Sequence, residues 1–188
     1  MLDAIIEWDK ALFVSLNSMG SPTWDALWIF ITKKSFFIVY PILIYLIFKA
    51  KGRDGFIVIA FIALTVLLCD RISVECFKEV FKRLRPDHTE GLGDQVRFLM
   101  NKAGKYSFVS SHATNVFGVA GVLSAILGKH YKGIYLYLFI WASVVSYSRV
   151  YVGKHYPLDL VGGAILGLLI SIVVVQLYRF VINRKTKK

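Results

Sequence analysis

The sequence predicts an all-α integral membrane protein, a helical bundle with five or six transmembrane helices and an N-terminal interfacial helix. Three observations predict this fold class. Of the 188 residues, 56% are hydrophobic and 15% are aromatic, as is typical of polytopic membrane proteins. Several long apolar runs contain no Lys, Arg, Asp or Glu, and short basic clusters separate them. The length suits a single domain that covers residues 1–188.

The first part of this domain, residues 1–34, is predicted to lie in the membrane interface or to be half inserted. Over residues 3–17 the charged side chains fall largely on one helical face, which predicts an amphipathic helix lying in the interface. A Gly-Ser-Pro break follows at residues 20–22. The apolar segment 24–32 is too short to span a bilayer alone. A sixth span assembled from both N-terminal pieces remains open.

The main predicted helical bundle occupies residues 35–182 and is followed by a basic tail, residues 183–188. Its five expected spans are residues 35–48, 55–69, 107–128, 133–148 and 160–178. The second span is expected to continue as helix to about Leu84, because the following proline discourages further helix. Lys78 and Arg85 would then lie two turns apart on nearly one face. In the last span, Gly163 and Gly167 predict a face of small residues for close helix packing.

The basic residues indicate a membrane rather than a nucleic acid as the partner. The formal net charge is +11, but the cations lie in short clusters between apolar runs and not along one soluble face. They fit anionic lipid headgroups and the positive-inside rule. If loops 49–53 and 129–132 and the C-terminal tail are cytoplasmic, loop 82–106 and segment 149–156 lie together on the opposite side.

The stretch 148–159 carries charged and titratable side chains between two apolar runs. Pro157 is tolerated in the first turn of a helix. His155 and Asp159 are four residues apart, so the carboxylate can reach back to one imidazole nitrogen near that helix start. Such a pair orients a base or a nucleophile. A capped helix end with an unrelated ion pair is the alternative interpretation.

Two further stretches favour the functional interpretation, because together the three form an ordered set of motifs. These motifs are Lys78 with Arg85-Pro86, then Val109-Ser110-Ser111-His112, then Ser148-Arg149 with His155 and Asp159. The set resembles the type 2 phosphatidic acid phosphatase family, whose motif also occurs in glucose-6-phosphatase-like enzymes and vanadium haloperoxidases. The flanking apolar runs fit the membrane-bound bacterial branch. The second family motif usually reads Pro-Ser-Gly-His, and this chain departs from it at Val109 and Ser111.

The resemblance implies a lipid phosphatase that works through a phosphohistidine intermediate. His155, held by Asp159, would attack phosphorus, and His112 would protonate the leaving oxygen and then activate water. The residues implied to bind phosphate are Lys78, Arg85, Ser110, Ser111 and Arg149. We expect no metal ion and no cofactor, because these cations already neutralise the phosphate and no carboxylate or His/Cys cluster has metal-site spacing.

Among the family's substrates, undecaprenyl pyrophosphate is the first choice, because small enzymes of this type resemble bacterial carrier-lipid recycling phosphatases. Phosphatidylglycerol phosphate, phosphatidic acid and lipid A 1-phosphate remain open. The resemblance implies a bacterial inner (cytoplasmic) membrane protein with a periplasmic or extracytoplasmic active site. Its partners are the phosphorylated lipid and the membrane, with no obligate protein partner. The alternative of another class is a catalytically silent lipid-binding or transport protein. A vanadium haloperoxidase is disfavoured because those enzymes are soluble.

Overall fold

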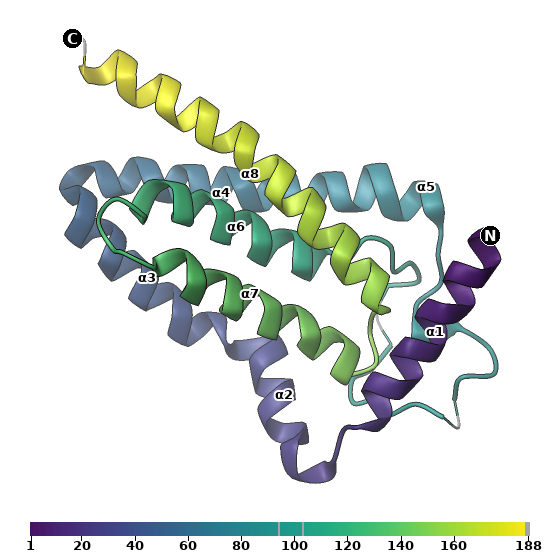
Figure 1. Ribbon diagram of the computed structural model, residues 1–188. Helices are drawn as coiled ribbons and strands as arrows, with labels where there is room; N and C mark the ends of the chain where they lie inside the picture. Colours follow the sequence, from purple (N-terminus) through teal and green to yellow (C-terminus); the bar gives the residue numbers. More distant parts are fainter. Residues whose placement is uncertain (94, 103, 187–188) are drawn as a thin grey trace.

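The computed structural model describes residues 1–93, 95–102 and 104–186, and within these ranges the chain is helical with no strand. Its only described β-type pairing is an isolated bridge between Leu84 and Tyr106. The helices in chain order are α1 (Leu2–Ser18), α2 (Pro22–Lys34), α3 (Phe36–Lys51), α4 (Gly55–Ile72), α5 (Glu79–Phe81), α6 (Ser111–Leu127), α7 (Ile134–Tyr151) and α8 (Pro157–Thr186). Figure 1 shows them as one bundle. The all-α prediction is confirmed.

Helix α6 lies at the centre of the bundle, between α4, α7 and α8 (Figure 1). Most of its side chains are buried. Helix α8 approaches it closely, because a Cβ atom added at Gly163 would lie 2.7 Å from the Ser110 carbonyl oxygen. A Cβ atom at Gly167 would collide with the backbone of Thr114 and Gly118. The predicted packing face of small residues is therefore confirmed.

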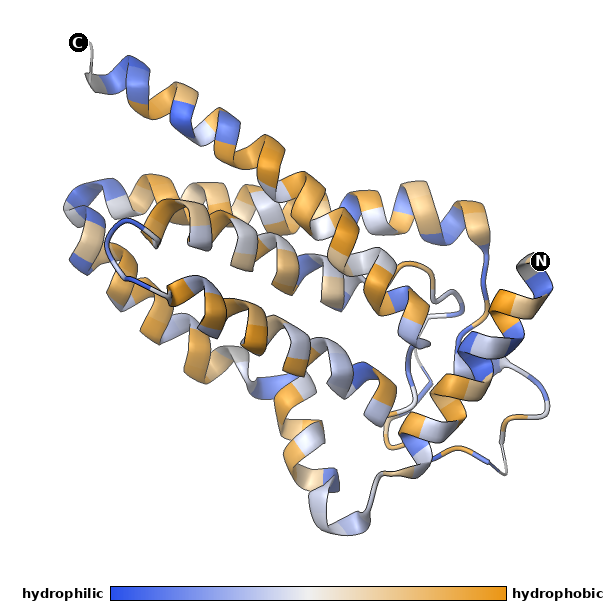
Figure 2. Cartoon of the chain, viewed as in Figure 1, coloured by the Kyte–Doolittle hydropathy of each residue, from blue (hydrophilic) through white to orange (hydrophobic). Residues whose placement is uncertain are grey.

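The outer surface of the bundle is strongly apolar. Two continuous helical stretches, Phe37–Phe81 and Pro157–Lys185, are long and apolar enough to cross a membrane, and the first includes the turn at Gly52–Asp54 between α3 and α4. Large side chains such as Phe56 stand exposed on this surface, and Figure 2 shows apolar residues along the outer faces of α3 and α8. Hydrocarbon around these helices removes that apolar area from water.

The helix that carries Lys78 ends earlier than predicted. After α4 the chain forms a π-helical turn, Ser73–Lys78, then α5, and helix stops at Phe81 because Lys82 takes a left-handed conformation with φ 48°. Arg85 therefore does not lie on the same helix as Lys78, and the predicted spacing of two helical turns is wrong. Other expected boundaries differ as well, and the clearest cases lie at the start of α6 and the end of α8. Residues 107–110 precede α6, and residues 183–186 of the expected tail continue α8.

The two ends of the bundle differ in character, as the charge pattern predicted. At one end, an ion pair between Lys185 and Asp54 joins the end of α8 to the α3–α4 turn. At the other end, loop 82–106 meets segment 149–156, where Leu99 N donates to Val152 O at 3.3 Å. Figure 1 shows this second end beside α1. The predicted meeting of these two segments is confirmed, and their side of the membrane stays a prediction.

Helix α1 packs against the loops at this second end. Asn17 is fully buried, and its Nδ2 donates to Val150 O at 3.0 Å and to Tyr151 O at 2.9 Å. Its Oδ1 accepts a hydrogen bond from Arg97 N at 2.7 Å. Asp9 is also fully buried. The charge pattern of residues 3–17 predicted the helix but not these buried polar contacts.

Candidate active site

A cavity of about 520 Å³ lies at the loop-rich end of the bundle. Six of the eight predicted site residues line it: Lys78, Arg85, Ser111, His112, Arg149 and His155. They come from the π-helical turn, loop 82–106, the first turn of α6, the end of α7 and the α7–α8 connection. The cavity thus brings together three cationic side chains and two imidazoles from segments far apart in sequence.

Ser111 holds Lys78 at the cavity wall. Lys78 Nζ donates to Ser111 Oγ at 2.8 Å, and the same hydroxyl lies 2.8 Å from Ser73 Oγ. The serine that replaces the usual family glycine is therefore accommodated and takes part in the cavity. Because Ser111 opens α6, the positive end of that helix also faces the cavity.

Arg85 is positioned by the backbone of loop 82–106. Its Nε donates to Tyr106 O at 3.0 Å, and its backbone N donates to Lys105 O at 3.1 Å. The neighbouring bridge between Leu84 and Tyr106 keeps these two segments side by side. The guanidinium therefore reaches the cavity from an extended segment that hydrogen bonds hold in place, and no described residue accepts a hydrogen bond from its two Nη groups.

Arg149 is 5% exposed, and one of its contacts comes from a helix that carries none of the motifs. Its Nη1 donates to Thr32 Oγ1 of α2 at 2.7 Å. Its Nε is buried and has no hydrogen-bond partner among the residues that the structure describes. A buried N–H without an acceptor costs about 1–3 kcal/mol. Arg149 also lines the cavity, and a guanidinium pairs readily with phosphate.

The imidazole of His155 is fixed by Asp159. His155 Nδ1 lies 3.3 Å from Asp159 Oδ2, and the same oxygen accepts from Tyr156 N at 2.9 Å. His155 is 1% exposed. Burial, reinforced by the nearby Arg149, lowers the pKa of His155 well below its ordinary value. Burial therefore favours the neutral form of the ring, whose Nδ1 is directed to the carboxylate.

Asp159 itself does not line the cavity and lies behind His155. Its Oδ1 accepts from Arg83 Nη1 at 3.0 Å and from Ser107 Oγ at 3.4 Å. With the two contacts at Oδ2, both carboxylate oxygens are occupied. This buried carboxylate is thus held in one orientation, as a group that orients a nucleophile should be.

The two remaining motif residues, His112 and Ser110, differ in their access to the cavity. His112 lies in the first turn of α6 and is accessible from the cavity. Ser110 precedes α6, is fully buried and does not line the cavity. Its Oγ has no hydrogen-bond partner in the described part of the chain, while its backbone N donates to Asp159 O at 3.0 Å. The prediction that the Ser110 side chain contacts phosphate therefore finds no support in this geometry.

A second buried ion pair braces the catalytic segment. Lys154 Nζ donates to Asp87 Oδ2 and to Asn101 O, each at 2.6 Å, and both charged side chains are 2% exposed. Burial raises the pKa of Asp87, but hydrogen bonds from Lys154 and His88 outweigh it and leave the pKa below its usual value. Loop 82–106 is thereby tied to the residue immediately before His155.

Sequence reasoning missed several residues around the site: Asp9, Thr32, Ser73, Arg83, Asp87 and Lys154. Only Arg83 and Lys154 carried a signal, since each lies inside a motif as an intervening cation. The others lie in helices or loops where a single polar residue is unremarkable. Among the described residues, no group of three His, Cys, Asp or Glu side chains could hold a metal ion.

This chain is similar to known proteins over most of its length. The profile of the PAP2 superfamily matches residues 54–182. A lipid A 4'-phosphatase of Porphyromonas gingivalis is 31% identical, over 97% of this chain and 78% of that protein. An undecaprenyl-diphosphatase of Sulfolobus acidocaldarius is 33% identical, over 92% of this chain and 79% of that protein.

A solved structure agrees with the sequence matches. The crystal structure of a transmembrane PAP2 type phosphatidylglycerolphosphate phosphatase from Bacillus subtilis has a TM-score of 0.68 to this chain at 26% identity, and covers 91% of this chain and 84% of that one. The profile covers more than half of the chain, and the relatives exceed 30% identity over nearly all of it. The chain therefore belongs to the PAP2 superfamily and is a lipid phosphatase.

Proposed function

We propose that this phosphatase hydrolyses a phosphate monoester of a lipid A-type glycolipid through a phosphohistidine intermediate at His155. One observation carries the proposal: the cavity with three cations and two histidines adjoins a long apolar groove. A phosphate group and a hydrocarbon chain of one molecule can therefore be bound at once. Such a pairing is what a phosphorylated lipid needs and what a soluble phosphate ester does not.

The proposed chemistry begins with His155. Nε2 of the neutral imidazole attacks phosphorus, and the bond from phosphorus to the ester oxygen breaks. His112 donates a proton to that oxygen, and the lipid alcohol leaves. The imidazolium that forms keeps its proton on Nδ1, where Asp159 accepts it in a hydrogen bond. His112 then takes a proton from water, and the water oxygen attacks phosphorus, which releases phosphate and restores His155.

The cationic side chains stabilise charge on the equatorial phosphoryl oxygens during both steps. Lys78, Arg85 and Arg149 approach the cavity from separate elements and are fixed by Ser111, Tyr106 and Thr32 respectively. Donors that are already in place need no reorganisation as charge develops, which is the usual basis of such stabilisation. We propose that these cations replace a metal ion, and activity in EDTA tests this.

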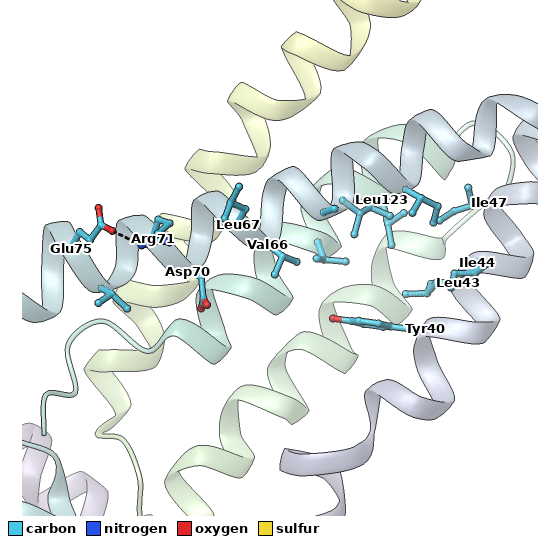
Figure 3. A pocket seen from close by; sticks show the side chains of 15 residues that line it. Tyr40, Leu43, Ile44, Ile47, Val66, Leu67, Asp70, Arg71, Glu75 and Leu123 are labelled. Atoms are coloured by element: carbon cyan, nitrogen blue, oxygen red, sulfur yellow. Dashed lines mark hydrogen bonds and ion pairs between the residues drawn. The ribbon is translucent and has the colours of Figure 1, made fainter. Parts of the chain in front are cut away.

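The apolar groove has a volume of about 760 Å³ and lies between α3 and α4, with α6 as its floor. Figure 3 shows Leu43, Ile47 and Val66 among its lining side chains. Its lining extends from Ile59 of α4 to Glu75 of the π-helical turn, about 24 Å at the rise of an α-helix. One leaflet contributes roughly half of a hydrocarbon core about 30 Å thick. The groove is therefore long enough for a lipid acyl chain.

The junction of cavity and groove is polar. Tyr40 lines both. Asn115 of the cavity donates from Nδ2 to Asp70 Oδ1 of the groove at 3.3 Å. Amide and carboxylate groups at this place can bind hydroxyl and amide groups between phosphate and acyl chain. An acylated sugar has such groups, whereas an isoprenoid pyrophosphate joins phosphate directly to hydrocarbon.

The relatives also support a lipid A phosphate as the first candidate substrate and undecaprenyl pyrophosphate as the second. A lipid A 4'-phosphatase matches almost the whole chain, so a lipid A phosphate replaces undecaprenyl pyrophosphate as the first choice. Undecaprenyl pyrophosphate stays the second candidate, because the relative of that name is similar over nearly as much of the chain. We place the protein in a bacterial inner membrane with the cavity on the extracytoplasmic side. The basic turns at the opposite end support this orientation.

The test is phosphate release by detergent-purified protein in EDTA. The substrates are bisphosphorylated lipid A, undecaprenyl pyrophosphate, phosphatidylglycerol phosphate and phosphatidic acid, with His155→Ala as the inactive control. We expect the highest kcat/KM on lipid A, with mass spectrometry locating the lost phosphate. A higher kcat/KM on undecaprenyl pyrophosphate would overturn the substrate choice. Full activity of His155→Ala, or dependence on added metal, would overturn the mechanism.

A further inference from the structure

We propose that Arg83, clamped by Asp9, is a positioning residue that acts through Asp159, and that helix α1 thereby forms part of the active site. This inference rests on the proposed roles of His155 and Asp159. It assigns a function to two residues that neither contact the cavity nor belong to the signature residues of the motifs. The two lie 74 positions apart in the chain.

The guanidinium of Arg83 bridges two buried carboxylates. Its Nη2 donates to Asp9 Oδ2 at 2.7 Å, and its Nη1 donates to Asp159 Oδ1 at 3.0 Å. Both carboxylate side chains are 0% exposed, and that of Arg83 is 20% exposed. The planar fork of arginine suits this double contact. The ring of Tyr156 lies 4.2 Å from the guanidinium carbon and supports it from one face.

Asp9 is itself fixed to the start of α8. Its Oδ1 accepts a hydrogen bond from Leu158 N at 2.9 Å. Leu158 immediately precedes Asp159, so Asp9 contacts the helix turn that carries the orienting carboxylate. Arg83 and Asp9 together therefore hold both the side chain and the backbone position of Asp159.

The charges along this chain of contacts alternate. Asp9 is negative, Arg83 positive and Asp159 negative, and His155 is neutral before reaction. When Nε2 bonds to phosphorus, His155 becomes cationic and the alternation extends by one group. Without Arg83, two buried carboxylates would face each other uncompensated. Without Asp9, the Arg83 cation would be compensated by Asp159 alone, which would leave less negative charge for the cation that must develop on His155. Arg83 and Asp9 should therefore affect the step that forms the phosphohistidine more than they affect binding of the lipid.

Two variants of Arg83 test the proposal in the full-length purified enzyme. In Arg83→Met the bridge is lost, and we expect kcat to fall about 10- to 100-fold, as is usual when a group that orients an active-site ligand is removed. Arg83→Lys keeps the charge, but a single ammonium cannot hold both carboxylates in the same geometry. We expect it to fold and to lose about 10-fold in kcat. In both, KM should stay within about twofold, because the cavity and groove are untouched.

Asp9→Asn should lower kcat in the same way, and the double variant Asp9→Asn with Arg83→Met should be no worse than Arg83→Met alone. The matched control for Asp9 is Glu7→Gln on the same helix, whose carboxylate is 70% exposed. The matched control for Arg83 is Arg53→Met in the exposed turn at the opposite end. Both controls should keep wild-type kcat.

The decisive readout is the rate of phosphohistidine formation, followed by rapid acid-free quenching with labelled substrate. It should fall in parallel with kcat for the Arg83 variants. Wild-type kcat in folded Arg83→Lys would overturn the proposal, and so would a loss confined to KM. If His155→Ala abolishes turnover while Arg83→Lys does not lower kcat, this inference fails and the proposed function stands. If His155→Ala stays active, the proposed function fails first.

Discussion

The polar cavity and the apolar groove adjoin each other, yet they are built in opposite ways. The cavity gathers its functional side chains from five separate segments, and specific hydrogen bonds hold Lys78, Arg85, Arg149 and His155. The groove is formed mainly by α3 and α4, two helices joined by the short turn Gly52–Asp54, and most of its lining is aliphatic. The function of the cavity therefore depends on the positions of single polar atoms, whereas the function of the groove depends on its overall shape.

Because the two regions are built differently, mutations in them should change different kinetic constants. A change of one atom in the cavity disturbs charge stabilisation in the transition state and should appear in kcat. A change in the groove alters burial of a chain that is bound equally in ground state and transition state, and should appear in KM.

Replacing Asp159 by Asn should cause the largest loss. The amide no longer carries the charge that stabilises a cationic phosphohistidine, and it can hold His155 in the wrong tautomer. The corresponding change in a serine protease triad lowers kcat by about 10⁴, and we expect a loss of roughly 10³-fold or more on every lipid. Steady-state phosphate release measures it. His130→Ala, at the opposite end of the bundle, should retain full activity. An Asp159→Asn enzyme within tenfold of wild type would contradict the division of roles.

Filling the groove should change substrate selection instead. Ala63 lines the groove and is exposed, so Ala63→Trp can occupy the space without disrupting the core. Displacing two or three methylenes of a bound chain from the groove costs about 2 kcal/mol, or roughly 30-fold in KM. The loss should be absent for a water-soluble phosphate ester without an acyl chain, measured in the same detergent.

The chain offers a matched control for this change. Ala60 is an exposed alanine of the same helix that does not line the groove. Ala60→Trp should therefore leave KM for the long-chain lipid unaltered. Equal losses in both variants, or a loss on the soluble ester as well, would show that the groove does not hold the acyl chain.

Restoring the usual family glycine at Ser111 should have a smaller effect. Ser111→Gly removes the hydroxyl that accepts from Lys78 Nζ at 2.8 Å, a contact worth about 1 kcal/mol, or roughly fivefold in kcat/KM. Ser111→Ala removes the same hydroxyl without adding backbone freedom. The two variants should therefore behave alike in phosphate release. If only the glycine variant loses activity, backbone freedom and not the hydroxyl is responsible.

The sequence predicted the cavity better than the groove for a physical reason. Phosphate chemistry needs particular atoms, so Lys78, Arg85, Arg149, His112 and His155 are recognisable wherever their spacing recurs. The apolar residues of α3 and α4 differ little from those of any membrane span, and only packing reveals that these two helices leave a groove. Helix type and order followed from the uncharged runs, whereas helix ends such as that at Phe81 depended on local backbone conformation.

Membership in a motif did not determine where every side chain lies, and most of the supporting residues carried no local signal. Ser110 belongs to the second motif, yet it is fully buried and does not line the cavity, and its backbone carbonyl oxygen lies against Gly163 of α8. Thr32 reaches Arg149 across 117 positions. Contacts over such distances depend on how whole helices pack, so single-sequence reasoning could not have paired them.

The smallest predicted effect concerns stability and pH. The pKa of His155 is lowered in the folded protein below its ordinary value of 6.5, so below that pH the unfolded chain binds a proton that the folded chain does not. The stability associated with neutral His155 is therefore complete above pH 6.5 and is lost as pH falls toward the folded pKa. The melting temperature of wild type should fall more steeply between pH 7.5 and 5 than that of His155→Gln. Ala63→Trp should keep the wild-type slope, because the groove contributes no titrating group of this kind. If melting temperature falls with pH equally in wild type and His155→Gln, burying His155 adds no pH-dependent cost. The polar cavity and the apolar groove would then differ in shape but not in this electrostatic property.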